Sequence, residues 1–183
     1  MSFDGARDLA VLLLVPLGLL AAVDGLYLHL WRLRLHERPE CRREHLLHTA
    51  RALLFPPSLA LVYGFESAGV ALWLGVALVL VDTALEGWDT FEEPASRQAL
   101  GGLAAGEALL HVVLVTLRAA SLVLAIGAAP GASWSWDATP ILSGVEPWQA
   151  FVVWSGLLPG SLLVAALHVT LAVRTRSALL RRA

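Results

Sequence analysis

The chain has 183 residues, 57% of them hydrophobic, a formal net charge of −2, and 13 basic residues that are all arginine. A soluble domain of this length would be nearer 45–50% apolar, so a membrane protein is expected. The single cysteine, Cys41, excludes an intrachain disulfide framework and a cysteine-based zinc site. No basic groove or aromatic–basic motif is present, so no nucleic-acid partner is expected.

Five apolar stretches are long enough, at about 20 residues each, to cross a bilayer as helices. In chain order they cover residues 9–31, 44–64, 69–88, 100–127 and 148–173. Two aspartates precede the first stretch and no small-residue cleavage site follows it, so we expect a retained membrane span rather than a signal peptide. No internal repeat or linker divides the chain. The sequence predicts an all-α integral membrane protein in which residues 1–183 form one transmembrane helical bundle.

The arginines predict the orientation of this bundle, because cytoplasmic loops are enriched in them. Eleven arginines fall on one side if the N-terminus is outside and the C-terminus is cytoplasmic, whereas the other side keeps only Arg7 and Arg118 falls inside the fourth stretch. The eleven are Arg32, Arg34, Arg38, Arg42, Arg43, Arg51, Arg97, Arg174, Arg176, Arg181 and Arg182. We therefore expect a plasma-membrane protein, of the bacterial inner-membrane kind, with this topology.

With that topology, nearly all ionisable residues inside the apolar stretches fall at one depth, in the half nearest the arginine-rich side. Arg118 is the exception. The others are Asp24, His29, Glu44, His48, Asp82, Glu86, Glu107, His111 and His168. Charges inside a membrane are costly and persist only when they are paired or bound. Carboxylates and imidazoles at one level, with few arginines nearby, indicate a bound metal cation.

The spacing within each stretch supports this interpretation. Residues four apart share a helix face, and Glu44 with His48, Asp82 with Glu86, and Glu107 with His111 are such pairs. Asp24 and His168 add one group each from the first and last stretches. His29 would lie about 140° around an α-helix from Asp24, at 100° per residue, so Asp24 is the preferred ligand. The predicted metal ligands are Asp24, Glu44, His48, Asp82, Glu86, Glu107, His111 and His168.

Such ligands projecting into a helical bundle resemble, in chemistry, the soluble di-iron carboxylate proteins. The motif differs, because this chain has Glu-x-x-x-His twice where those proteins have Glu-x-x-His. Imidazole and carboxylate together suit iron, zinc or manganese, and two divalent cations would balance about four carboxylates. Iron is the expected metal.

Several of these residues also have structural explanations. Glu44 could simply favour a helix N-terminus, and Asp82 could pair with Arg51 or orient a histidine. His36 and His45 are expected to be exposed or structural. Asp89, Glu92 and Glu93 precede Pro94 and are expected to be solvated in a loop, with Arg97 in the same connection.

The favoured function is an oxidoreductase acting on a hydrophobic or lipid-like small molecule, without an assignment of catalytic residues. Prolines in the second and fifth stretches, at Pro56-Pro57 and Pro159, would kink those helices and open a cavity toward lipid. The histidine clusters of membrane desaturases are absent. The alternatives are a zinc-dependent intramembrane hydrolase, a divalent-metal or proton transporter or sensor, a b-type haem protein and a structural subunit. An oligomer could complete a transport path that one protomer lacks.

Overall fold

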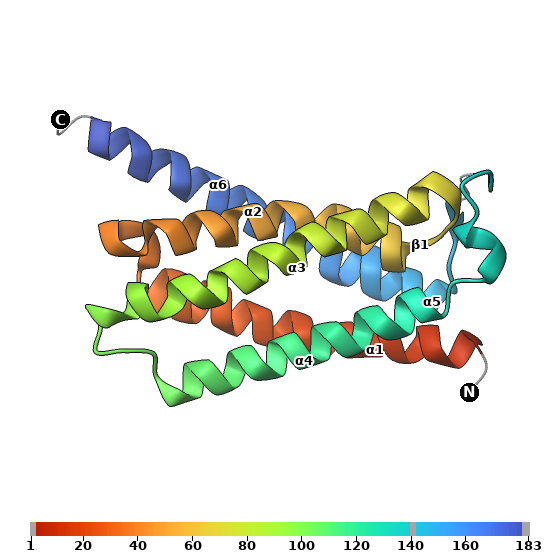
Figure 1. Cartoon of the computed structure of the whole chain (residues 1–183), viewed down its shortest axis with the longest axis horizontal. Helices are drawn as coiled ribbons and strands as arrows, with labels where there is room; N and C mark the ends of the chain where they lie inside the picture. The colour runs from red at the N-terminus through yellow and green to blue at the C-terminus, as the bar shows by residue number, and fades with distance from the viewer. Residues whose placement is uncertain (1–2, 140–141, 181–183) are drawn as a thin grey trace.

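The computed structural model describes residues 3–139 and 142–180, and nearly all of them are helical. The longer helical segments are α1 (Phe3–Ala22), which continues as the π-helical η1 (Val23–Arg32), α2 (Arg42–Leu59), which continues as η4 (Ala60–Gly64), α3 (Gly69–Gln98), α4 (Ala105–Gly127) and α6 (Leu158–Leu180). They run back and forth along the long axis of the molecule, and the two termini lie at opposite ends (Figure 1). The all-α prediction is confirmed.

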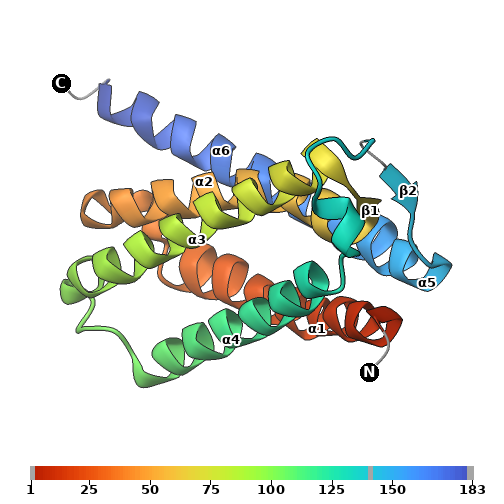
Figure 2. The ribbon, with the colours of Figure 1, turned by 45° about the vertical axis from the view of Figure 1, so that its right-hand side comes forward.

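Short elements connect the long helices. They are η2 (Leu35–Glu37), η3 (Pro39–Cys41), β1 (Phe65–Ser67), η5 (Gly131–Trp134), β2 (Leu142–Gly144), α5 (Pro147–Ala150) and the π-helical η6 (Phe151–Leu157). The two strands pair antiparallel, with Phe65 opposite Gly144. Figure 2 shows this pair beside α5, at the end of the bundle where the N-terminus lies. The arginine-rich connection, with η2 and η3, lies at the opposite end.

Four helical segments are long and apolar enough to cross a membrane. They are Gly5–Arg32, Gly69–Gln98, Ala105–Gly127 and Pro147–Thr175. Large apolar side chains on them point outward, among them Leu19, Val123 and Leu163, each about two-thirds exposed or more, which fits contact with lipid. The segment of α2 and η4 is the less apolar one, because Arg51, His48 and two prolines lie within it.

The apolar core occupies the half of the bundle nearest the N-terminus. Within the bundle α1 packs along α4, while α2 packs between α3 and α6 (Figure 2). The buried core residues are Ala10, Val11, Leu14, Leu17, Leu59, Val62, Tyr63, Val79, Ala125 and Val153. The ionisable residues gather in the other half, so packing and charge are separated along the bundle.

The first helix begins earlier and the last ends later than predicted, at Phe3 and Leu180, and two boundaries on either side of Gly101 also differ from the sequence prediction. The third stretch was expected to end near residue 88, but α3 runs to Gln98 through Pro94, because its charged last turns are buried against neighbouring elements. The fourth was expected to begin near residue 100, but α4 starts at Ala105. Gly101 and Gly102 have φ of +93° and +94° and form the turn before it.

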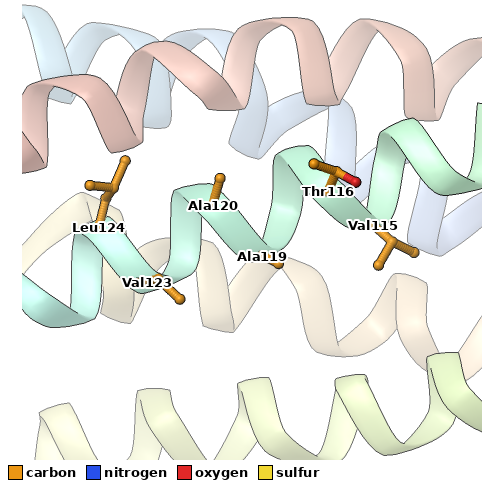
Figure 3. Close-up of a pocket in the computed structure, with 6 residues that line it drawn as sticks. All are labelled: Val115, Thr116, Ala119, Ala120, Val123 and Leu124. Carbon is orange, nitrogen blue, oxygen red and sulfur yellow. The ribbon is translucent and has the colours of Figure 1, made fainter.

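The prolines of the second stretch were expected to open a cavity, and a small one lies beside them. A cavity of about 20 Å³ lies there, lined by Phe55, Ser58, Asp82, Arg118 and neighbouring apolar residues, and this space holds about one water. A larger hollow of about 650 Å³ lies on the outer surface of α4, over Val115, Ala119, Val123 and nearby small residues (Figure 3). It lies open on the surface of a single helix.

The start of α3 depends on a glycine. Gly69 has a φ of +56°, and a Cβ there would lie 2.3 Å from the carbonyl oxygen of Ala138. We expect Gly69→Ala to lower the free energy of unfolding by about 1–3 kcal/mol, because both the conformation and the contact become strained. Thermal unfolding in detergent measures this. Gly87→Ala, in the same helix with open space around it, should instead be neutral or stabilising by up to about 1 kcal/mol. Equal melting temperatures for the two variants would contradict the argument.

Candidate metal centre

A π-helix brings Asp24 and His29 to the same side of the first helical segment. A π-helix bonds residue i to residue i+5, so residues five apart stack on one face. Both side chains lie in η1, are buried, and approach each other to 3.5 Å between His29 Nε2 and Asp24 Oδ1. The prediction that they would diverge by about 140° is wrong, because it assumed an α-helical period.

His29 is shared by two groups of side chains that could each hold a metal ion. The first group is Asp24, His29 and His111, and the second is His29, Glu44 and His48. His111 Nε2 lies 3.1 Å from Asp24 Oδ1, and His29 Nδ1 lies 3.2 Å from His48 Nδ1. Three helical segments, η1, α2 and α4, therefore bring imidazoles and carboxylates together.

The last turns of α3 add two carboxylates that were expected to be solvated. Asp89 and Glu93 are buried. Asp89 Oδ2 lies 2.8 Å from His48 Nε2, and Glu93 Oε1 lies 3.0 Å from His111 Nδ1. Neither ring nitrogen has the geometry of a hydrogen bond in these contacts. The spacing of Asp82, Glu86, Asp89 and Glu93 along one helix face was the signal that could have identified them.

Arg97 lies at the centre of this cluster and was expected in an aqueous connection. Its side chain is 1% exposed. It donates to Glu44 Oε2 at 2.6 Å, to Glu107 Oε1 at 2.6 Å, and lies 3.2 Å from His29 Nε2. Ser96 also donates to Glu44. A guanidinium with several donors in fixed directions can hold two carboxylates at once, so Arg97 fixes Glu44 of α2 and Glu107 of α4.

The predicted ligands Asp82 and Glu86 are paired with arginines instead of facing His29. Arg51 donates to both carboxylates, at 3.2 Å from Asp82. Arg118 donates to Glu86 at 2.5 Å and forms an ion pair with Asp82 at 2.5 Å. Among the described residues neither carboxylate belongs to the two groups around His29. The pairing of Asp82 with Arg51, one of the structural explanations weighed from the sequence, is what the structure contains.

The predicted ligand His168 lies apart from both groups. Its ring stacks on His45, with centroids 5.3 Å apart, and its centroid is 6.5 Å from that of His48. His168 is buried on α6, as the sequence indicated, and its nearest ring is an imidazole that was expected to be structural.

The charges around His29 do not balance. Five carboxylates surround this region, those of Asp24, Glu44, Asp89, Glu93 and Glu107. Arg97 supplies one positive charge, and Arg51 and Arg118 are matched in number by Asp82 and Glu86. Arg51 also lies 3.5 Å from Asp89. With neutral histidines and ionised carboxylates, four negative charges remain. Uncompensated buried charges are strongly destabilising, so this cluster requires cations, as protons or as metal ions.

Comparisons with known proteins give no assignment. No family model matches the chain, and neither the curated proteins nor the solved structures include a match to it. Any function must therefore be argued from the residues themselves.

Arg97 should be the most sensitive arginine in the protein. We expect Arg97→Ala to lower the free energy of unfolding by about 3–5 kcal/mol, because Glu44 and Glu107 would stay buried without their partner. Thermal unfolding followed by circular dichroism measures this. The matched control is Arg43→Ala, because Arg43 is 83% exposed and lies 3.7 Å from Glu92. Such a surface pair contributes at most about 1 kcal/mol. Similar losses in both variants would show that Arg97 does not organise the cluster.

Proposed function

We propose that this protein is a membrane-embedded metalloprotein with a dinuclear carboxylate–histidine centre. The observation that carries the proposal is the cluster of five buried carboxylates around three imidazoles, those of His29, His48 and His111, which with neutral histidines has a surplus of four negative charges. Two divalent cations would neutralise this surplus. Imidazole nitrogens and carboxylate oxygens are ligands that the same transition metals accept.

The distances between the ligand atoms support this assignment. Metal–ligand bonds of about 2.1 Å place neighbouring ligand atoms roughly 3 Å apart, with their lone pairs directed at the metal. Asp24 Oδ1 lies 3.1 Å from His111 Nε2, and Asp89 Oδ2 lies 2.8 Å from His48 Nε2.

Each metal position then has its own ligands. One position uses Asp24 and His111, and the other uses Glu44, His48 and Asp89, with His29 between them. Glu93 faces the other ring nitrogen of His111, Nδ1, and orients that ring, as outer carboxylates commonly do for metal-bound histidines. Glu107 lies 3.4 Å from His29 Nε2, the nitrogen that also faces Asp24, and is held there by Arg97. In this proposal Asp82 and Glu86 anchor arginines and bind no metal.

We further propose that the metal is iron and that the protein is an oxidoreductase with a hydrophobic or lipid-like substrate. Mixed carboxylate and histidine ligands within a helical bundle are typical of di-iron proteins, although zinc or manganese would accept the same ligands. The helices that carry the centre have apolar outer faces, with Trp31 71% and Leu109 65% exposed. Since the enclosed cavity holds about one water, the substrate would approach from the lipid side through movement of these side chains.

We also propose five membrane crossings, with α2 and η4 as the second, the N-terminus outside and the C-terminus cytoplasmic. The arginine distribution supports this orientation. The test uses Cys41→Ser combined with either Arg34→Cys or Asp137→Cys, two exposed positions at opposite ends of the bundle. In intact cells, a membrane-impermeant maleimide should label Asp137→Cys and should label Arg34→Cys only after lysis. The helices α2, α3 and α4 lie between these positions in the chain. If all three cross the membrane, the two positions lie on opposite sides, so labelling of both in intact cells would contradict the crossing by α2.

Metal content tests the proposed function directly. Full-length protein purified in detergent should contain about two equivalents of iron by elemental analysis. Glu93→Gln and His111→Gln should each lose metal, because His111 is a proposed ligand and Glu93 orients its ring. Glu92→Gln is the matched control, since Glu92 neighbours Glu93 in sequence and makes only peripheral contacts with Arg43 and Trp88.

The other outcomes are also decisive. Zinc in place of iron would contradict the oxidoreductase proposal and favour a hydrolase, and a Soret band would favour haem. Absence of metal after reconstitution with iron, zinc and manganese would overturn the metal centre. Protonated histidines would then be left as the counterions of the carboxylates, as in a proton pathway.

A further inference from the structure

A second group of histidines lies outside the carboxylate-rich centre. His36 is on η2, His45 on α2 and His168 on α6. The ring centroids of His45 and His168 are 5.3 Å apart, and those of His36 and His45 are 6.0 Å apart. Thr175 of α6 donates to the carbonyl oxygen of His36 at 2.9 Å. The connection before α2, the start of α2 and the distant helix α6 are thus held together around three imidazoles.

Each of these imidazoles has a buried nitrogen without a hydrogen-bond partner among the described residues. The atoms are His36 Nδ1, His45 Nε2 and His168 Nδ1. The side chains of His45 and His168 are also deeply buried, with 4% and 3% of each residue exposed. A buried polar atom without a partner is costly, and such atoms are rare in folded proteins. Three such nitrogen atoms close together indicate that they share one partner.

A metal ion is the partner that fits three imidazoles. With metal–nitrogen bonds of about 2.1 Å, two imidazoles on a tetrahedral ion have ring centroids roughly 5 Å apart. The separation of 5.3 Å between His45 and His168 matches this distance, and the 6.0 Å between His36 and His45 is longer. Rotation about the Cβ–Cγ bond of histidine is broad, so the rings can turn their unpartnered nitrogens toward one point. Glu37 lies 3.5 Å from His36 Nε2 and can orient that ring, as carboxylates do for metal-bound histidines.

We propose that His36, His45 and His168 form a mononuclear trihistidine site for a divalent transition metal, with zinc as the expected ion. Its chemistry differs from that of the carboxylate-rich centre. Nitrogen ligands favour zinc, copper or nickel, and mixed ligands with many carboxylates favour iron or manganese. Three protein ligands leave the fourth position of zinc open to water or another molecule. The site does not depend on the proposed dinuclear centre.

The test is a zinc titration of the full-length protein in detergent after chelator treatment. We expect His36→Gln and His168→Gln each to bind one zinc equivalent fewer than the wild type. His36 lies in a connection, so its replacement spares the helix packing. With cobalt in place of zinc, the wild type should show the strong visible absorption of a tetrahedral nitrogen site, and both variants should lose it. Circular dichroism checks that the variants are folded.

Variants of the other centre separate the two proposals. His111→Gln and Glu93→Gln should keep the cobalt absorption of the trihistidine site, even if they lose iron or never contained it. Folded His36→Gln and His168→Gln proteins that bind as much zinc as the wild type, with unchanged cobalt spectra, would overturn the trihistidine site. A cobalt signal lost in His111→Gln and kept in His168→Gln would also overturn it, because the signal would then belong to the carboxylate-rich centre.

Discussion

Buried negative charge is the constraint on which the polar half of this bundle depends. Carboxylates enter it from η1, α2, α3 and α4, in a chain whose long helices are apolar enough for lipid. Arg97 joins three of these segments, because it contacts His29 of η1, Glu44 of α2 and Glu107 of α4 from the end of α3. Helices held by charge in one half need little apolar packing there, and the buried apolar residues accordingly gather in the other half.

The irregular helix geometry follows from the same constraint. In an apolar environment every backbone polar group must be satisfied within the protein, so departures from the α-helix are tolerated where neighbouring groups compensate for them. The π-helix η1 lies where Asp24 and His29 meet polar side chains of α2, α3 and α4. Its wider turn places both side chains on one face. The π-helical turn thus brings Asp24 and His29 into the polar cluster, and the polar side chains of the cluster stabilise the irregular helix.

The sequence predicted the helical membrane fold and the common depth of the ionisable residues, because hydropathy and arginine counts depend only on composition along the chain. It also identified Asp24, Glu44, His48 and His111, which the structure brings together around His29. It did not reveal that Asp89, Glu93 and Arg97 are buried, since a charged run before a proline is typical of a solvated loop. Nor could it choose which carboxylates pair with Arg51 and Arg118, because those contacts join residues more than 30 positions apart.

The distribution of arginines separates the part of the cluster that can change its charge from the part that cannot. Guanidinium groups stay protonated in proteins, so Asp82 and Glu86, each bound by two arginines, have permanent counterions. The side chains of Asp82, Glu86, Arg51 and Arg118 lie between the cluster and the apolar core. Asp82 and Arg118 line the small cavity together with Tyr63 and Leu59. Arg97 likewise holds Glu44 and Glu107, and Arg51 also contacts Asp89. Among the described residues, Asp24, Glu93 and the imidazoles form no ion pair with an arginine, so their counterions are exchangeable, whether protons or metal ions. Binding and release of cations, and any reaction that depends on them, are therefore confined to the end of the bundle beyond this arginine–carboxylate layer.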